Sequence, residues 1–128
     1  MSRVVLDASA LMAVINREPG VERLTPQIMS AAAASAVNLA EVHGKLVQRG
    51  FSPNDAWAAA NGVIDEAVAF TAEQAKTAGD LVVLTRALGL SLGDRACLAL
   101  GIALGAPVYT ADRAWKNLKL SIRIHVIR

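Results

Sequence analysis

The stretch Arg3-Val4-Val5-Leu6-Asp7-Ala8-Ser9-Ala10-Leu11 decides the fold. After Arg3, a short run of β-branched and leucine residues predicts a buried strand, and this run stops at Asp7. From residue 8 to residue 16 the larger apolar side chains follow helical spacing, so a helix begins directly after the strand. A strand that passes into a helix within one residue is typical of a parallel α/β sheet.

The same alternation continues along the chain. We expect strands over residues 3–6, 31–36, 67–71, 107–110 and 122–126. We expect helices over residues 8–16, 21–29, 37–49, 53–64, 72–88 and 91–104, with one helical turn over 114–118. This alternation predicts an α/β fold with a mostly parallel sheet of about five strands, covered on both faces. The last strand alternates polar and apolar residues, as is typical of a sheet edge.

Length and composition indicate one domain over residues 1–128. Hydrophobic residues make up 54% of the chain, which is enough for a core without disulfides. The one cysteine, Cys97, lies in an apolar run, so we expect a small core residue and a reducing cytoplasm. No signal segment is recognisable, and Pro26 and Pro107 interrupt the longest uncharged stretches, so we expect no membrane span.

The net charge of +2 is too small to indicate a nucleic-acid partner by itself. The distribution of charge is more informative, because basic residues gather near the C-terminus: Arg113, Lys116, Lys119, Arg123 and Arg128. Such a cluster is either an ordinary solvated surface or a site for RNA phosphates, and the sequence leaves both interpretations open.

Four carboxylates are candidates for a functional site. Asp7 and Asp112 each follow a predicted strand directly, and parallel α/β sheets bind their ligands at the carboxyl ends of the strands. Asp94 lies in the first turn of a helix that is apolar nearly all round, so we expect it at the mouth of a buried helix. Glu41 lies in the early turns of another helix that leaves the sheet.

Each carboxylate also has a simpler explanation. The two that follow strands precede helical turns, where they would serve as N-caps. Asp94 with Ser91 matches a capping box, and Glu41 is spaced for an ion pair with Lys45. Four carboxylates at one edge would, however, repel one another, and a divalent cation removes that conflict. Oxygen-only ligands suit Mg²⁺ or Mn²⁺, and the lack of a Cys/His cluster argues against zinc.

Four segments, in this order, resemble the PIN-domain family and within it the VapC toxins of bacterial toxin–antitoxin pairs. They are Val4-Val5-Leu6-Asp7-Ala8-Ser9-Ala10-Leu11, Ser35-Ala36-Val37-Asn38-Leu39-Ala40-Glu41-Val42, Leu90-Ser91-Leu92-Gly93-Asp94 and Val108-Tyr109-Thr110-Ala111-Asp112. The resemblance extends over essentially the whole chain, and all four acidic positions of the family are filled. It implies a single PIN domain over residues 1–128 with a PIN-like three-layer α/β/α sandwich.

The resemblance further implies a metal-dependent endoribonuclease toxin that hydrolyses phosphodiester bonds in RNA. Asp7 and Asp94 would be the main ligands of Mg²⁺ or Mn²⁺, and Glu41 and Asp112 would complete the shell directly or through water. Three neighbouring side chains would orient ligands or a phosphate oxygen: Ser9, Asn38 and Thr110. Three basic side chains are candidates for RNA phosphate contacts: Arg95, Arg113 and Lys116. The implied partners are a second copy of the chain in a homodimer and a VapB-like antitoxin.

Two other functions stay open at this point. A regulatory domain of the receiver type also gathers acids around Mg²⁺, but it needs a phosphorylatable aspartate at the end of the middle strand. We expect the strand over residues 67–71 to be that strand, and it ends in Thr71 with Ala72 next, which argues against a receiver domain. A PIN scaffold that binds RNA or a protein without cutting is the other alternative, and the complete acidic set argues against it. Metal-dependent cleavage of RNA separates the three functions.

Several other residues are weaker candidates for a functional role than the four carboxylates. We interpret His43 and His125 as surface residues, so catalysis by paired imidazoles has little support. Trp57 lies among alanines and is predicted to be in the core or at a subunit interface. Gly44 and Lys45 lack the glycine loop and the Ser/Thr of a phosphate-binding loop, which excludes NTP hydrolysis of that type.

Overall fold

The computed structural model describes residues 2–128, and in them five strands form one sheet whose neighbouring strands are all parallel. The strands are β1 (Val4–Leu6), β2 (Ala32–Ser35), β3 (Glu66–Val68), β4 (Val108–Thr110) and β5 (Ile124–Val126). Their order across the sheet is β3-β2-β1-β4-β5, so the first strand of the sequence is the central strand. The edge position predicted for the last strand is confirmed.

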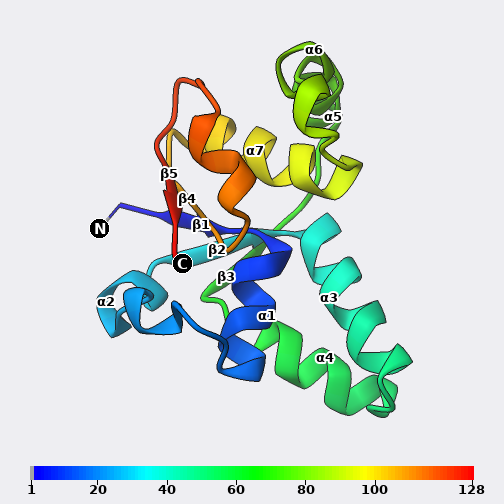
Figure 1. Cartoon of the computed structure of the whole chain (residues 1–128). Helices are drawn as coiled ribbons and strands as arrows, with labels where there is room; N and C mark the ends of the chain where they lie inside the picture. Colours follow the sequence, from blue (N-terminus) through cyan, green and yellow to red (C-terminus); the bar gives the residue numbers. More distant parts are fainter. Residues whose placement is uncertain (1) are drawn as a thin grey trace.

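Helices connect the strands and surround the sheet (Figure 1). The α-helices are α1 (Ala8–Asn16), α2 (Pro26–Met29), α3 (Ala36–Gln48), α4 (Pro53–Asn61), α5 (Ala72–Asp80), α6 (Val82–Thr85) and α7 (Leu92–Leu104). The 3-10 helices are η1 (Val21–Arg23), η2 (Arg86–Leu88) and η3 (Arg113–Asn117).

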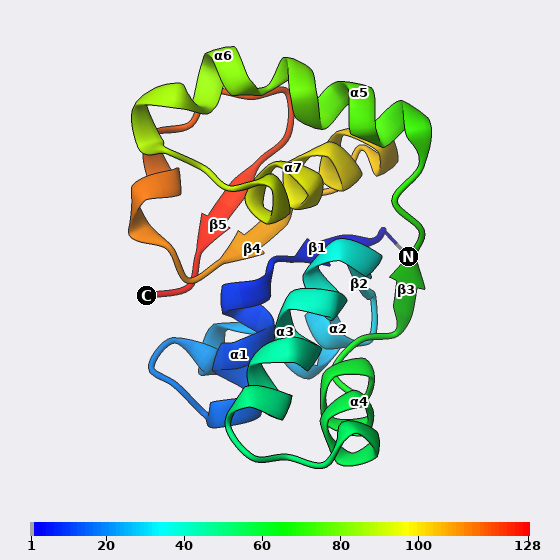
Figure 2. The same cartoon turned by 90° about the vertical axis from the view of Figure 1, so that its right-hand side faces the viewer.

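Two hydrophobic cores lie on the two faces of the sheet, and β1 contributes to both. Val4 and Leu6 pack with residues of α1, α3 and α4, whereas Val5 packs with Leu98 of α7, Val108 of β4 and Trp115 of η3. The two groups of helices lie on opposite sides of the sheet in Figure 2. The predicted three-layer α/β/α arrangement is therefore confirmed, and it leaves the residue after β1 between the two helical layers.

Several helix starts follow the capping signals of the sequence. Ser52 accepts a hydrogen bond from the backbone N–H of Asp55 and is followed by Pro53, as expected for the first residues of a helix. Ser91 and Asp94 form the predicted capping box at the start of α7. Gly105, with a positive φ of 60°, ends α7 in the left-handed conformation that glycine adopts without strain.

Two predicted helices are each divided in the structure. The helix expected over 21–29 is η1 followed by α2, because the Thr25 side chain caps a new helix whose first residue is Pro26. The helix expected over 72–88 is α5, α6 and η2, and it is interrupted near Leu81. The interruption follows Gly79 and Asp80, which favour helices weakly, and precedes two β-branched residues.

The central position of β1 corrects the argument used against a receiver domain. The strand at Glu66–Val68 lies at the edge of the sheet and is not the middle strand. The residues that follow it therefore give no evidence for or against a receiver domain. The middle strand, β1, ends at Leu6 and is followed directly by Asp7. The receiver fold is instead excluded by topology, because its strand order is 2-1-3-4-5 and this order is 3-2-1-4-5.

His43 does not lie on the surface as predicted, and Trp57 does not lie in the core, whereas the other position predicted for Trp57, at a subunit interface, stays a prediction. His43 is half-buried rather than on the surface, and its ring meets the ring of Trp57 edge to face with centroids 5.7 Å apart. Trp57 is 46% exposed and is therefore not a core residue. Cys97, by contrast, is fully buried as predicted. No helix within residues 2–128 combines the length and the apolar character needed to cross a membrane.

Candidate active site

Asp7 is a buried carboxylate at the carboxyl end of the central strand. Its side chain is 3% exposed, and Oδ1 accepts a hydrogen bond from the backbone N–H of Ala10, so Asp7 is the N-cap of α1. Thr110 at the end of β4 donates to Oδ2 at 2.6 Å, and Ser9 donates to both oxygens at 2.7 and 2.9 Å. Three donors therefore fix the orientation of this carboxylate.

The two hydroxyl groups beside Asp7 are themselves oriented by the backbone. The Ser9 hydroxyl oxygen accepts from the N–H of Ala111 at 2.9 Å, and the Thr110 hydroxyl oxygen accepts from the N–H of Asp112 at 3.0 Å. Because each hydroxyl accepts from a backbone N–H, its own hydrogen is available for the Asp7 carboxylate. A continuous set of hydrogen bonds thus connects the end of β1 to the end of β4.

Burial makes the negative charge on Asp7 costly. Loss of hydration raises the pKa of Asp7 to about 6, although the hydrogen bonds from Thr110, Ala10 and Ser9 act in the opposite direction. The negative charge of Asp94 raises the pKa of Asp7 further, so the two carboxylates are close enough to repel each other. A group with these properties gains from a nearby positive charge.

Glu41 lies against the first turn of α7. Asn38, one turn earlier on α3, donates from Nδ2 both to Glu41 Oε1 and to the carbonyl oxygen of Gly93, each at 3.0 Å. A Cβ atom on Gly93 would overlap the Glu41 carboxylate, because it would lie 2.5 Å from Cδ and 2.6 Å from Oε2. The carboxylate therefore occupies space that any other residue at position 93 would fill.

Of the simpler explanations considered for the carboxylates, three are confirmed and one is wrong. Asp7 caps α1, Asp94 accepts from the Ser91 N–H at 3.0 Å in the capping box, and Asp112 accepts from the Ala114 N–H at 3.0 Å before η3. In residues 2–128, Glu41 has no ion pair with Lys45. Capping and a functional role do not exclude each other, because each of these carboxylates has further oxygen lone pairs.

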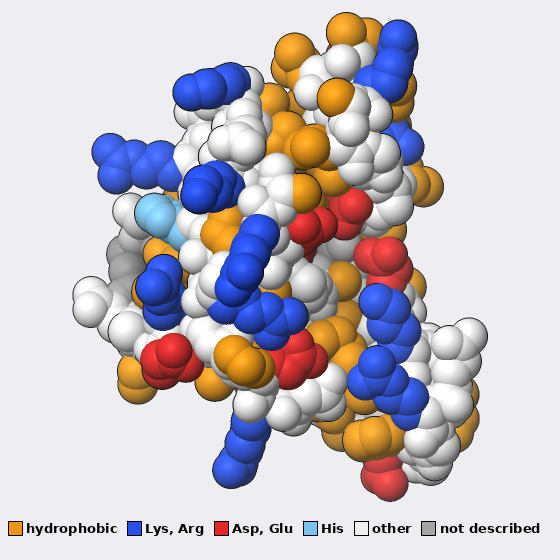
Figure 3. All heavy atoms as spheres, viewed as in Figure 1, with side chains coloured by type: hydrophobic (Ala, Val, Ile, Leu, Met, Phe, Trp, Pro, Cys, Tyr) orange, Lys and Arg blue, Asp and Glu red, His pale blue; other side chains and the backbone are white. Residues whose placement is uncertain are grey.

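Three of the four carboxylates lie near enough to the buried Cys97 to affect its pKa. Burial raises the pKa of the Cys97 thiol well above its usual range, and the negative charges of Asp7, Asp94 and Glu41 raise it further. Figure 3 shows acidic side chains near the middle of one face, with Lys and Arg side chains on both sides. We call Asp7, Glu41, Asp94 and Asp112 the acidic site.

The acidic site fits a hard divalent cation by the chemistry of its donors. All four side chains offer carboxylate oxygens, and the Oδ1 atom of Asn38 is buried beside them without a hydrogen-bond donor. Their present spacing is wider than a coordination shell, because no three Asp, Glu, His or Cys side chains of residues 2–128 are gathered closely enough to hold an ion. Side-chain rotation of at least one carboxylate would be needed to surround a cation.

The three basic candidates have different environments. Arg95, next to Asp94, is half-buried and donates from Nη1 to the carbonyl oxygen of Ala78 at 2.9 Å. It lines a small cavity that also contains the side chain of Arg86. Arg113 and Lys116 are exposed on η3, and Arg113 donates from Nε to the carbonyl oxygen of Arg128.

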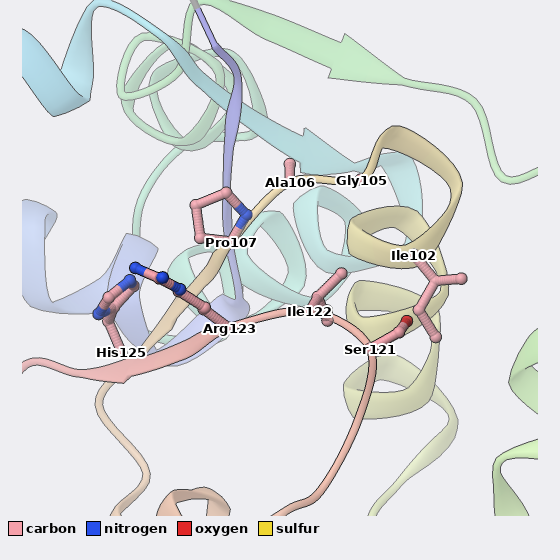
Figure 4. A pocket seen from close by; sticks show the side chains of 8 residues that line it. All are labelled: Ile102, Gly105, Ala106, Pro107, Ser121, Ile122, Arg123 and His125. Atoms are coloured by element: carbon pink, nitrogen blue, oxygen red, sulfur yellow. The ribbon is translucent and has the colours of Figure 1, made fainter.

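A larger cavity lies elsewhere. It has a volume of about 430 Å³ and lies at the amino ends of β4 and β5, opposite the acidic site. Figure 4 shows Arg123 and His125 beside each other on one side of it and Ile102 on the other. His125 is exposed, as predicted, and its ring stacks on that of Tyr109 at 4.7 Å. This cavity contains no carboxylate, so it is separate from the acidic site.

The sequence interpretation missed Gly93 and the position of Cys97. Glycine is unfavourable in helices, so a glycine beside the acidic residue in the first turn of an otherwise strong helix is a signal of close packing. Cys97 follows Asp94 by about one helical turn, so it lies beneath the same side of α7.

Comparisons with known proteins agree on the fold. The DNA-bound VapBC complex of Salmonella typhimurium contains a chain that is 17% identical, with 100% of both chains covered and a TM-score of 0.77. VapBC2 of Rickettsia felis, bound to a promoter fragment, gives 17% identity, 98% coverage of both chains and a TM-score of 0.75. VapC20 of Mycobacterium tuberculosis, described as a sarcin-ricin loop cleaving toxin, gives 21% identity, coverage of 94% of this chain and 98% of that chain, and a TM-score of 0.73.

A search of curated protein sequences found no match. The family model described as the PIN domain matches residues 4–120, from β1 through the residues that follow η3. This match spans most of the chain and includes all four carboxylates of the acidic site, and the solved structures share the same fold. The chain therefore belongs to the PIN-domain family.

Proposed function

We propose that the chain is a single PIN domain that acts as a VapC-type toxin, an endoribonuclease that depends on Mg²⁺ or Mn²⁺. The observation that carries this proposal is the environment of Asp7. A buried carboxylate that is oriented by three donors, and whose pKa is raised to about 6 mainly by burial and further by the charge of Asp94, is costly to ionise unless a positive charge lies near it. A divalent cation of the kind that prefers oxygen ligands meets this requirement.

All four carboxylates would contribute to binding the cation. Asp7 and Asp94 would be the principal ligands, because they are close enough for one to affect the pKa of the other. Glu41 and Asp112 would contribute directly or through water. When bound, the cation would make a water molecule more acidic and offset the negative charge of the phosphate.

The surrounding polar residues would keep these carboxylates in place. Ser9 and Thr110 direct their hydroxyl hydrogens to Asp7, and Asn38 holds Glu41 against α7. Their role would be to position ligands or a phosphate oxygen, and none of them would exchange a proton with the substrate. Arrangements of this type raise the affinity and the activity of metal sites about 10- to 100-fold.

RNA would approach along the basic side chains near the acidic site. Arg95 with Arg86, and Arg113 with Lys116, would contact phosphates on the two sides of the scissile bond. None of these four residues has a carboxylate partner among the ion pairs of residues 2–128. Their positive charges are therefore available to an anion.

A homodimer and a VapB-like antitoxin in the cytoplasm are the partners we propose. Several of the structural neighbours are VapBC toxin–antitoxin complexes. Exposed apolar side chains offer two surfaces for such contacts, one at α6 with Val83 and Leu84, and one where α3 meets α4 with Phe51 and Trp57. Expression of the chain alone should arrest bacterial growth, and co-expression of a VapB-like antitoxin that binds it should relieve the arrest. Unchanged growth with soluble, full-length protein would count against the toxin role.

RNA cleavage with Mg²⁺ or Mn²⁺, compared with EDTA, tests the enzymatic proposal. We expect cleavage that disappears with EDTA and returns when Mn²⁺ is added in excess. RNA binding without cleavage under every metal condition would instead support a PIN scaffold that binds without cutting.

The chemical groups at the ends of the RNA fragments show which nucleophile attacks the phosphate. If water is the nucleophile, its oxygen bonds to phosphorus, the bond to the 3′ oxygen breaks, and that oxygen takes up a proton. The products then carry a 5′-phosphate and a 3′-hydroxyl. If the 2′-hydroxyl attacked instead, with a histidine as base, a 2′,3′-cyclic phosphate would form. End-labelling and ligation of the fragments distinguish the two, and a cyclic phosphate would overturn the mechanism.

A further inference from the structure

We infer that Gly93 is a positioning residue, whose missing side chain lets the Glu41 carboxylate rest against the first turn of α7 beside Asp94. This inference rests on the proposed function, because it concerns how one carboxylate of the acidic site is placed. It starts from a question that the fold leaves open, namely why a glycine stands at the start of a helix.

The backbone does not require glycine at this position. Gly93 has no positive φ, in contrast to Gly20, Gly50, Gly89 and Gly105. It lies in the second position of α7, a helix of 13 residues that is otherwise rich in alanine and leucine. An alanine would therefore suit the local conformation, and it would favour the helix.

The surroundings do require it. A Cβ atom on Gly93 would meet the three carboxylate atoms of Glu41 before any other group, at 2.5 Å from Cδ, 2.6 Å from Oε2 and closer still to Oε1. The Glu41 carboxylate is the end of a flexible side chain, so it would move aside while the backbone of α7 stayed in place. The cost of a side chain at position 93 would fall on the position of Glu41 and not on the fold.

Asn38 also holds the Glu41 carboxylate in this position. It is 1% exposed, and its Nδ2 group donates one hydrogen to Glu41 Oε1 and the other to the Gly93 carbonyl oxygen. The amide cannot be turned over, because Oδ1 would then face two acceptors. Asn38 therefore binds the carboxylate of α3 and the backbone of α7 at the same time, which sets the distance between Glu41 and Asp94.

The test compares Gly93→Ala with the wild-type protein and with Gly44→Ala as a matched control. Gly44 is also helical, lies on the same helix as Glu41, and has open space around an added Cβ. We expect Gly93→Ala to keep or slightly raise the melting temperature and to weaken binding of Mn²⁺ alone by about 10-fold or more. Gly44→Ala should leave Mn²⁺ binding unchanged. A fall in melting temperature with unchanged Mn²⁺ affinity would make Gly93 a packing residue and overturn the inference.

The Glu41→Ala background removes the overlap and isolates its effect. There Gly93→Ala should fold as well as Glu41→Ala alone and should not weaken Mn²⁺ binding further. This arm also decides the case in which Gly93→Ala does not fold, because a double variant that equally failed to fold would contradict the inference.

A metal-free measurement separates this inference from the proposed function. In NMR spectra without metal, the Asn38 side-chain amide hydrogen that bonds to Glu41 should shift in Gly93→Ala, since that bond is lost, and should stay in place in Gly44→Ala. Unshifted Asn38 resonances would overturn the inference even if the protein cleaves RNA. Shifted resonances in a protein that neither binds Mn²⁺ nor cleaves RNA would support the inference that Gly93 makes room for the Glu41 carboxylate, and they would reject the proposed function.

Discussion

Asp7 and Asp112 follow neighbouring strands and both cap the next helix, yet their environments differ sharply. Asp7 is buried, accepts hydrogen bonds from three groups and has a pKa raised to about 6, whereas Asp112 is exposed and accepts from one backbone N–H. The difference arises because Asp7 ends the central strand, between two layers of helices. Sequence position brings both residues to the same edge of the sheet, and burial gives Asp7 more hydrogen-bond donors than Asp112.

The largest expected effect follows from removing the charge of either proposed principal ligand, Asp7 or Asp94. Asp7→Asn and Asp94→Asn should each lower RNA cleavage by more than about 1,000-fold, since one lost hydrogen-bond donor to a transition state already costs about 100- to 1,000-fold. Circular dichroism should show an unchanged fold. Metal-dependent activity equal to wild type in either variant would remove that residue from the proposed ligands.

Thr110 connects the Asp7 carboxylate to the backbone N–H of Asp112, and its loss should have the next largest effect. Thr110→Val removes the donor to Asp7 Oδ2 and the acceptor for the Asp112 N–H while it keeps the shape. We expect cleavage to fall about 10- to 100-fold, and Thr110→Ser to restore most of it. The hydrogen bond from Thr110 lowers the pKa of Asp7, so the variant should raise that pKa. NMR titration of the Asp7 carboxyl group would measure it, and an unchanged pKa would contradict this role.

Asp112 should matter less than Asp7. Asp112→Asn keeps an oxygen for the Ala114 N–H and removes only the charge of an exposed side chain, so we expect a loss of about 10-fold in cleavage. Cleavage assays run beside Asp7→Asn test the comparison directly. If the two variants lost activity equally, burial would not distinguish their roles.

The smallest effect is on stability, and it depends on pH. The folded-state pKa of Asp7 is raised, so deprotonation disfavours the folded state as the pH rises from about 4 to about 6. Above that range the metal-free wild type should be less stable than Asp7→Asn by up to about 3 kcal/mol, and the two should converge below pH 4. The asparagine can keep the network, because its amide can donate to Thr110, whose hydroxyl can turn toward Ser9, 3.2 Å away.

Denaturant unfolding at several pH values, in EDTA, measures this difference. The comparison between the two proteins matters, because other carboxylates affect both curves alike. A variant that is less stable than wild type at neutral pH would show that the hydrogen bonds to the charged carboxylate outweigh the cost of its desolvation.

The sequence by itself determined the alternation of strands and helices and the order of the four carboxylates. These features depend on residues that are near one another in the chain. A run of β-branched residues forms a strand, Ser52 with Pro53 starts a helix, and Ser91 with Asp94 caps one. The division of the helix expected over 72–88 was missed because weak local preferences at Gly79 and Asp80 compete with a strong overall pattern.

The tertiary structure alone decided how the acidic site is built. The contact of Thr110 with Asp7 joins residues 103 positions apart, and that of Asn38 with Gly93 joins residues 55 positions apart. The raised pKa of Asp7 comes mainly from burial by both helical layers, and the need for glycine at position 93 comes from the Glu41 carboxylate on another helix. Desolvation and steric overlap depend on which atoms meet in space, and no local pattern of residues specifies that.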